Sequence, residues 1–290
     1  MTERADTAAA SPYGLRRVLL AGAETLVFAG EDGLHPLAST LGELLAAGRR
    51  ELEAAVDAAI ASSPVSADGA SVLPPVDTQE IWASGVTYMR SRAARMSESV
   101  AADVYSRVYD APRPELFLKA PAWRVPTPGS PLRIRRDSKW DVPEPELALV
   151  VAASGEIVGY LVGDDMSSRE IEGDNPLYLP QAKIYDDALG LSDTIVLARD
   201  SSWEQTDIRI AITRGETIVY AGTISTGTMR RTFDELVGYL FRELTHPSGV
   251  VLLTGTGLVP PDEITLDTGD EVEIEIDGVG VLRHGVYRAG

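Results

Sequence analysis

Paired carboxylates are the first feature of this sequence that could do chemistry. Glu144 and Glu146 are separated by a single residue at the start of an apolar, extended segment. On a β-strand, side chains two residues apart point to the same face and lie ~6.5–7 Å apart. Two negative charges on one covered face repel each other unless a proton or a cation lies between them. Oxygen ligands of this type suit Mg²⁺, with Ca²⁺ or Mn²⁺ as alternatives.

An ordinary solvated strand can carry the same spacing, as the alternating acids of residues 271–275 illustrate. A third acid favours the metal site. The apolar run 157–162 ends in Gly-Asp-Asp, and a hairpin would return that end beside Glu144. Asp165 is therefore the expected third ligand, with Asp164 as the competing candidate. Three carboxylates that leave coordination positions open for substrate are typical of a catalytic metal site.

Lysine is scarce in this chain, with Lys119, Lys139 and Lys183 as the three lysines among 26 basic residues. Because arginine serves wherever a generic positive charge is needed, the lysines are the better candidates for chemistry that uses a compact, tunable ammonium. Lys183 lies in a stretch that we interpret as strand-like. Its alternative role is an exposed charge at a strand edge. Lys119 and Glu115 share a second expected strand, just before the paired carboxylates.

Short strands are expected to position these residues. From residue 115 onward, apolar runs of four to six residues alternate with Gly, Pro and Asp turns, which is typical of a β-sandwich or β-roll. One helix, Thr232–Leu244, interrupts these strands, and another helical pattern, from Tyr88 to about Tyr109, precedes them. The expected strands are Ile81–Val86, Leu147–Ala152, Ile157–Val162, Thr194–Ala198, Ile208–Thr213, Thr217–Thr223, Val250–Leu253 and Glu271–Ile276.

The N-terminal part has a different pattern. A hairpin over residues 17–29 precedes a helical pattern over Leu41 to Ala61, and Leu73-Pro74-Pro75 marks a boundary. We therefore expect a small N-terminal α+β domain, residues 1–73, and a metal-dependent catalytic domain, residues 74–290. The fold class is α+β, mainly β, with a mixed β-sandwich or β-roll as the catalytic domain.

Composition excludes several classes of protein. The chain has no cysteine, which excludes disulfides, thiolate nucleophiles and Cys-ligated metals. A net charge of −18 argues against nucleic acid and anionic membranes as partners. No apolar run approaches the roughly 18–20 residues of a membrane span, and the polar N-terminus has no signal-peptide pattern. We expect a cytoplasmic protein.

Several motifs occur together, in a characteristic order and spacing, over about Thr78 to the C-terminus. They are Trp82-Ala-Ser-Gly-Val-Thr-Tyr88, Glu144-Pro-Glu-Leu-Ala148, Gly159-Tyr160 through Asp165-Met-Ser-Ser-Arg169, Gln181-Ala-Lys183, Thr254-Gly-Thr-Gly257, Gly269-Asp-Glu-Val272 and Ile276-Asp-Gly-Val-Gly280. Together these motifs resemble the fumarylacetoacetate hydrolase family. The resemblance implies that Glu144, Glu146 and Asp165 are metal ligands, and that the catalytic β-roll assembles into a homodimer or homotetramer.

One departure from the family pattern points to the reaction. Family hydrolases carry a His three residues after the motif Tyr, paired with a Glu that activates water, but Tyr88 is followed by Met, Arg and Ser. The three histidines, His35, His246 and His284, show no ligand or triad spacing and are interpreted as surface or packing residues. The chain therefore looks most like the branch that dehydrates 2-keto-3-deoxy-D-arabinonate.

The expected reaction is the Mg²⁺-dependent dehydration of a 2-keto-3-deoxy sugar acid to 2,5-dioxopentanoate and water, in pentose catabolism. Lys183 takes the C3 proton, because a nearby cation favours a neutral amine, and Glu115 protonates the departing C4 hydroxyl. These two roles could be exchanged. The substrate-binding candidates are Ser84, Gly85, Tyr88, Arg90, Arg92, Lys119 and Thr256. The Thr-Gly-Thr-Gly loop lacks the lysine of a phosphate loop and suits a substrate carboxylate better.

Two other functions remain open from the sequence. The same metal site could serve a hydrolase or decarboxylase of acylpyruvate-type diketo acids with a different base. Alternatively, the chain could be a catalytically silent scaffold that binds metal for structure alone.

Overall fold

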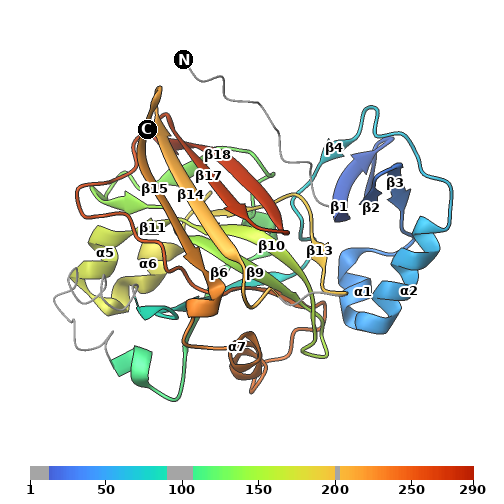
Figure 1. Ribbon diagram of the computed structural model, residues 1–290, viewed down its shortest axis with the longest axis horizontal. Coiled ribbons are helices and arrows are strands. Elements are labelled where there is room, and N and C mark those ends of the chain that lie inside the picture. Colours follow the sequence, from blue (N-terminus) through green and yellow to red (C-terminus); the bar gives the residue numbers. More distant parts are fainter. Residues whose placement is uncertain (1–12, 90–106, 200–202) are drawn as a thin grey trace.

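The computed structural model describes residues 13–89, 107–199 and 203–290, and strands make up most of its regular structure. A small unit lies at one end of the molecule, beside a larger body of two sheets and short helices (Figure 1). The expected α+β, mainly β class is confirmed. Within the described ranges, no helix is long and apolar enough to cross a membrane.

The small unit has a four-stranded sheet in the order β3-β2-β1-β4, where β1 and β2 form the expected hairpin. The helical pattern expected over Leu41 to Ala61 is confirmed, and the structure divides it into two helices. They part at Gly48, whose φ of 103° lies in the region that favours glycine and ends the first helix. The elements are β1 (Gly14–Leu20), β2 (Ala23–Gly30), β3 (Gly33–Pro36), α1 (Leu41–Ala47), α2 (Arg49–Ile60) and β4 (Ser71–Val72).

The larger body contains two main sheets. The central sheet runs β12-β10-β9-β16-β5-β6, with β13 also paired to β10, and the second sheet runs β15-β14-β17-β18-β7. A short pair, β8 and β11, lies apart from both. The central-sheet strands are β5 (Glu80–Gly85), β6 (Glu115–Ala120), β9 (Pro145–Val151), β10 (Ile157–Asp165), β12 (Leu189–Leu191), β13 (Val196–Leu197) and β16 (Val250–Leu253). The other strands are β7 (Leu132–Ile134), β8 (Asp141–Val142), β11 (Ser167–Ser168), β14 (Asp207–Arg214), β15 (Thr217–Ser225), β17 (Asp270–Ile276) and β18 (Gly280–Arg288).

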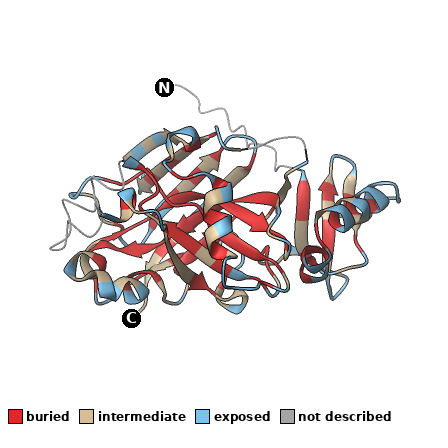
Figure 2. Cartoon of the chain, turned by 90° about the horizontal axis from the view of Figure 1, so that it is seen from below, coloured by how far each residue is buried: buried red, intermediate tan, exposed pale blue. Residues whose placement is uncertain are grey.

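The central sheet is covered on both faces. Along β9, Leu147, Leu149 and Val151 pack into a core shared with the second sheet, whereas Ala148 and Val150 pack into a core shared with α1 and α2. Figure 2 shows buried residues concentrated in the sheets and exposed ones on the peripheral helices and loops. Each fully buried Leu or Val contributes roughly 1.5–3 kcal/mol, so this strand is a rigid support for the carboxylates at its start.

The helices of the larger body are short. The expected helix Thr232–Leu244 is α7 (Phe233–Leu240), where Thr232 is the N-cap and accepts a hydrogen bond from the N–H of Glu235. The others are α5 (Arg169–Asp174), α6 (Leu179–Lys183) and three 3₁₀ turns, Ala122–Arg124, Pro176–Tyr178 and Thr226–Thr228.

Two further expectations, a helix and a domain boundary, are not fully tested by the structure. Of the expected helix from Tyr88 to Tyr109, residues 107–110 are helical, and most of the remainder lies outside the described residues. Tyr88 itself forms an isolated β-bridge with Met229. The domain boundary at residues 73 and 74 stays a prediction, since α1 and α2 share a core with the central sheet.

Candidate active site

Glu144, Glu146 and Asp165 converge where β9 begins and β10 ends. The antiparallel register places Glu146 opposite Gly163, and the N–H of Asp165 donates to the carbonyl of Glu144 at 3.0 Å. One carboxylate oxygen from each of the three acids lies within 4.8 Å of the others, and all three side chains are buried. The hairpin return is what brings the third acid to the first two. Asp164 is not in this group, because successive side chains of a strand point to opposite faces.

Three cationic side chains contact the acids. The Nζ of Lys183 donates to Oε2 of Glu144 at 2.7 Å and to Oδ2 of Asp165 at 2.8 Å. The Nζ of Lys119 lies 2.5 Å from Oδ1 of Asp165, and the guanidinium of Arg169 lies 2.9 Å from Oε1 of Glu144. Buried acids of this kind need such partners, since an unpaired buried charge costs several kcal/mol. Arg169 belongs to one of the family motifs, but its spacing in the sequence gave it no predicted role.

The local structure of Lys183 differs from the expectation. The stretch is not strand-like, because Lys183 is the last residue of the short helix α6, and the charge is buried rather than exposed at an edge. Pro180 stands in the first turn, where the missing N–H costs no hydrogen bond, and its carbonyl accepts the N–H of Ile184. From the end of this short helix, the Lys183 side chain points into the acid cluster.

Glu146 differs from its neighbours in its partners. Its Oε2 accepts the backbone N–H of Gly255 at 2.5 Å, and within the described residues no cationic side chain forms an ion pair with it. Burial, followed by the negative charges of Asp165 and Glu144, raises the pKa of Glu146 well above its ordinary value. A divalent cation among the three acids would relieve this repulsion, so this all-oxygen group fits Mg²⁺.

The Gly255 contact corrects the expectation for the Thr-Gly-Thr-Gly loop. This N–H binds a carboxylate of the protein itself instead of pointing to a substrate carboxylate. Gly255 has a φ of 91°, and a Cβ there would collide with Oγ1 of Thr87 and the carbonyl of Ser84. Only glycine meets both demands. Thr256, next along, lines the pocket, and its hydroxyl accepts the N–H of Leu258.

A small pocket opens onto the acid cluster. Glu115 is the first residue of β6 and lies opposite Gly85, the last residue of β5, and a Cβ on Gly85 would collide with the Glu115 carboxylate. Glycine at position 85 therefore leaves the space that Glu115 occupies. Four lining residues were not among the site candidates from the sequence: Val86, Phe117, Glu172 and Leu179. The other lining residues are Ser84, Gly85, Glu115, Glu144, Lys183 and Thr256.

Two of the substrate-binding candidates, Lys119 and Tyr88, are described by the structure but do not line the pocket. Lys119 is buried behind Asp165, where its Nζ also donates to the carbonyls of Met166 and Lys183, and burial lowers its pKa. Tyr88 is buried as well, and burial with the charge of Glu146 raises its pKa. Arg90 and Arg92 lie outside the described residues.

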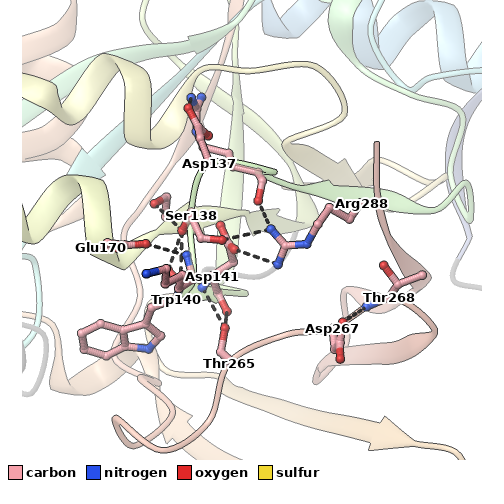
Figure 3. Close-up of polar contacts among 12 residues, drawn as sticks. Asp137, Ser138, Trp140, Asp141, Glu170, Thr265, Asp267, Thr268 and Arg288 are labelled. Carbon is pink, nitrogen blue, oxygen red and sulfur yellow. Dashed lines mark hydrogen bonds and ion pairs between the residues drawn. The ribbon is translucent and has the colours of Figure 1, made fainter. Parts of the chain in front are cut away.

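A polar network holds the start of α5, and with it Arg169. The N–H of Arg169 donates to the carbonyl of Trp140 at 2.8 Å, while Ser168 donates its hydroxyl to Ser138 at 2.9 Å. Figure 3 shows Arg288 reaching into this network, where its guanidinium donates to the Ser138 carbonyl at 3.0 Å. The C-terminal strand thereby helps to fix the segment that positions Arg169.

Asp141 is the buried acid of this network. Its carboxylate is fully buried, and the Arg288 guanidinium lies 3.6 Å away. Burial raises the pKa of Asp141 to about 6, against the opposing influence of Ser138 and Arg288. Within the described residues, neither carboxylate oxygen has a hydrogen-bond partner, which is consistent with a carboxyl group that holds its proton more firmly than usual.

None of the three histidines lines the pocket. His35 lies in the small unit beside Asp32, and His246 lies beside Trp82 and Phe241. All three are buried, so the surface interpretation is wrong. His284 also does more than pack, because its Nε2 hydrogen-bonds Oδ2 of Asp164 at 2.8 Å.

Comparison with known proteins identifies the family. The family model for the fumarylacetoacetate hydrolase C-terminal domain matches residues 80–287. This chain belongs to the fumarylacetoacetate hydrolase family. The resemblance inferred from the motifs is thereby confirmed, and the match includes all three acids of the cluster, Lys183 and Glu115.

Two relatives of this chain are named as dehydratases. A protein of Haloferax volcanii named probable 2-keto-3-deoxyxylonate dehydratase is 48% identical over 213 residues, which span 73% of each chain. The 2-dehydro-3-deoxy-D-arabinonate dehydratase of Saccharolobus solfataricus is 39% identical over 216 residues, 73% of this chain and 72% of that protein. A solved structure of 2-keto-3-deoxy-D-arabinonate dehydratase complexed with magnesium and 2,5-dioxopentanoate matches with a TM-score of 0.80 and 31% identity, over 95% of this chain and 99% of that one.

Proposed function

We propose that this member of the fumarylacetoacetate hydrolase family is a Mg²⁺-dependent hydro-lyase. Its substrate is 2-keto-3-deoxy-D-arabinonate or a closely related pentonate, and its products are 2,5-dioxopentanoate and water. The observation that carries the proposal is the pairing of Lys183 and Glu115 in one pocket beside three buried acids, with no histidine on its walls. The names of the relatives support the same reaction class.

The metal would be held by Glu144, Glu146 and Asp165. When bound, Mg²⁺ polarises the C2 carbonyl of a 2-keto acid and stabilises the negative charge that develops on its oxygen. Arg169 holds Glu144 from the side away from Lys183, as its ion pair uses Oε1 and the lysine uses Oε2. Lys119 does the same for Asp165, where it uses Oδ1 and Lys183 uses Oδ2.

Lys183 is the base in this mechanism. Its Nζ lies at the edge of the acid cluster and on the pocket wall, where it can take a proton from C3 of a keto acid. The electron pair of the C3–H bond then forms the double bond to C4 as the C4–O bond breaks. Glu115 protonates the departing hydroxyl, and one molecule of water leaves.

Glu115 also completes the product. After water has left, C5 and its hydroxyl each give up a proton while C3 and C4 each take one, which converts the C5 alcohol to an aldehyde. A carboxyl group on the pocket wall can carry these protons, and the Glu115 carboxylate packs directly against Gly85, which holds it in place. Thr256 and Ser84 line the same pocket, where they limit the space for the substrate chain.

The experiment is a substrate comparison. Purified protein with Mg²⁺ is incubated with 2-keto-3-deoxypentonates or with acylpyruvates, and semialdehyde formation, C–C cleavage and CO₂ release are followed. Semialdehyde that disappears with EDTA and returns with Mg²⁺ is expected. Cleavage or decarboxylation of acylpyruvate alone would instead identify a diketo-acid enzyme, and no turnover of either substrate would identify a scaffold.

We also propose that the chain acts as a homo-oligomer, a dimer or tetramer, in the cytoplasm. Family membership supports the assembly, and the acidic composition is consistent with a protein that avoids anionic membrane surfaces. Light scattering on the purified chain should give two or four times the 31.1 kDa of one chain. A mass of one chain at micromolar concentration would refute this part of the proposal.

A further inference from the structure

Asp164 lies next to an acid of the cluster but is used differently. Its Oδ1 accepts the backbone N–H of Glu144 at 2.9 Å, and its Oδ2 accepts a hydrogen bond from Nε2 of His284 at 2.8 Å. Both side chains are buried, with 0% and 4% of their surface exposed. The two carboxylate oxygens thus join a residue of the second sheet to the main chain of Glu144.

The backbone around Glu144 explains why a side chain is needed there. Pro143 and Pro145 flank it, so Glu144 has the one N–H among these three residues. Pro145 lies opposite Asp164 in the register and has no N–H to give to a sheet ladder. The Asp164 carboxylate accepts the neighbouring N–H instead. A residue that precedes proline is also confined to extended backbone, which limits the directions available to the Glu144 side chain.

The other end of this connection is well supported. His284 belongs to β18, between β17 and β7, and its Nδ1 lies 3.0 Å from the carbonyl of Gly285. Close packing surrounds Asp164, since Gly190 lies near its Cβ and a Cβ on that glycine would press against Leu132 and Leu282. The carbonyl of Glu144 meanwhile accepts the N–H of Asp165. Both polar backbone groups of Glu144 are therefore fixed.

We propose that His284 and Asp164 are positioning residues for the metal site. His284 orients the Asp164 carboxylate, which orients the main chain of Glu144 and so aims its side chain at the cation. The inference rests on the proposed Mg²⁺ site. Groups that orient ligands in this way typically change metal affinity about 10–100-fold when they are removed.

The test compares Mg²⁺ affinity, measured by calorimetry without substrate, in His284→Leu, His284→Gln and the unchanged protein. Leucine fills similar space but has no N–H, whereas glutamine places an amide N–H near the position of Nε2. We expect Mg²⁺ to bind His284→Leu about 10-fold more weakly, with most of the affinity restored in His284→Gln. The Mg²⁺ activation constant should rise in parallel, while kcat at saturating Mg²⁺ stays within a few-fold.

A matched control exists in the small unit. His35 is also buried, and its Nε2 also lies 2.9 Å from an aspartate oxygen, that of Asp32. His35→Leu should leave Mg²⁺ affinity unchanged. If His284→Leu does not fold, Asp164→Asn serves instead, because an amide nitrogen cannot accept from His284, and a loss of several-fold in affinity is expected.

The outcomes separate the two proposals. Unchanged Mg²⁺ affinity in His284→Leu or Asp164→Asn, or an equal loss in His35→Leu, would overturn the positioning role and leave the proposed function intact. An unchanged protein that binds no Mg²⁺ would overturn both. Semialdehyde formation without the predicted shift in affinity would support the function and refute this inference.

Discussion

The backbone N–H of Gly255 donates to Oε2 of Glu146 over 2.5 Å, which joins the glycine-rich loop after β16 to the acid cluster. The sequence separation of the two residues is large. The contact also determines which residue position 255 can hold, because a side chain there would meet both Thr87 and Ser84.

Gly255→Ala should therefore weaken both stability and metal binding. Gly269 is the control, because it has the same φ of 91° and a methyl group there would have no atom within 4 Å. Gly269→Ala therefore measures the cost of backbone strain alone, about 1–2 kcal/mol. We expect Gly255→Ala to lose more than this in urea unfolding and to bind Mg²⁺ about 10-fold more weakly. If both variants lost the same unfolding free energy and kept their Mg²⁺ affinity, the contact between Gly255 and Glu146 would contribute to neither stability nor metal binding.

Glu146→Gln should separate metal binding from folding. The raised pKa of Glu146 means that its charged form costs stability at neutral pH, so the variant measured in EDTA should be more stable than the unchanged protein. The gain should shrink as the pH falls towards the ordinary pKa of glutamate. Added Mg²⁺ at 100 times Kd should stabilise the unchanged protein by about 2.7 kcal/mol, but not the variant. Glu271→Gln, on the exposed face of β17, is the control and should keep the Mg²⁺ response.

The roles of Lys183 and Glu115 can be assigned by deuterium exchange. A five-carbon 2-keto acid without a C4 hydroxyl can exchange its C3 protons with D₂O but cannot lose water. Lys183→Met should slow this exchange about 10³-fold. Glu115→Gln should exchange the C3 protons at the normal rate but should dehydrate the 2-keto-3-deoxy substrate about 10²–10⁴-fold more slowly, which is the usual range for general acid–base groups. Lys139→Met, at the exposed lysine, should do neither. The opposite pattern would exchange the two roles.

Asp141 predicts a pH dependence of stability. Its pKa is raised to about 6, so between about pH 4 and 6 the folded chain holds a proton that the unfolded chain has lost. Stability therefore falls as the pH rises through this range, by on the order of 2 kcal/mol, and the penalty is complete above it. Urea unfolding from pH 4 to 8 should show this fall, and Asp141→Asn should remove it. In exposed Asp137, Arg135 lowers the pKa, so Asp137→Asn should change stability with the opposite dependence on pH.

Local sequence rules predict how the three acids of the cluster come together. Alternation along a strand placed Glu144 and Glu146 together, and a hairpin brought Asp165 beside them, because both depend on neighbours in the sequence. Local rules did not predict the helix that ends at Lys183 or the helix break at Gly48. A five-residue helix and a break between two helices leave little periodic signal in the sequence.

Contacts between distant segments account for the remainder. Gly255 is 109 residues from Glu146, and His284 is 120 residues from Asp164. No spacing rule relates such pairs, because their distance is set by how the two sheets pack. The same reason applies to Glu172, which reaches the pocket from α5 without a recognisable motif.

The burial of two of the three lysines has a practical consequence for labelling. Lys119 and Lys183 are 1% and 2% exposed, whereas Lys139 is exposed. Among lysine side chains, an amine-reactive dye or surface linker should attach at Lys139, in the loop before β8, and spare the pocket beside the acid cluster. Immobilised protein should consequently remain active, and any slow acylation of Lys183 would measure how often the pocket opens.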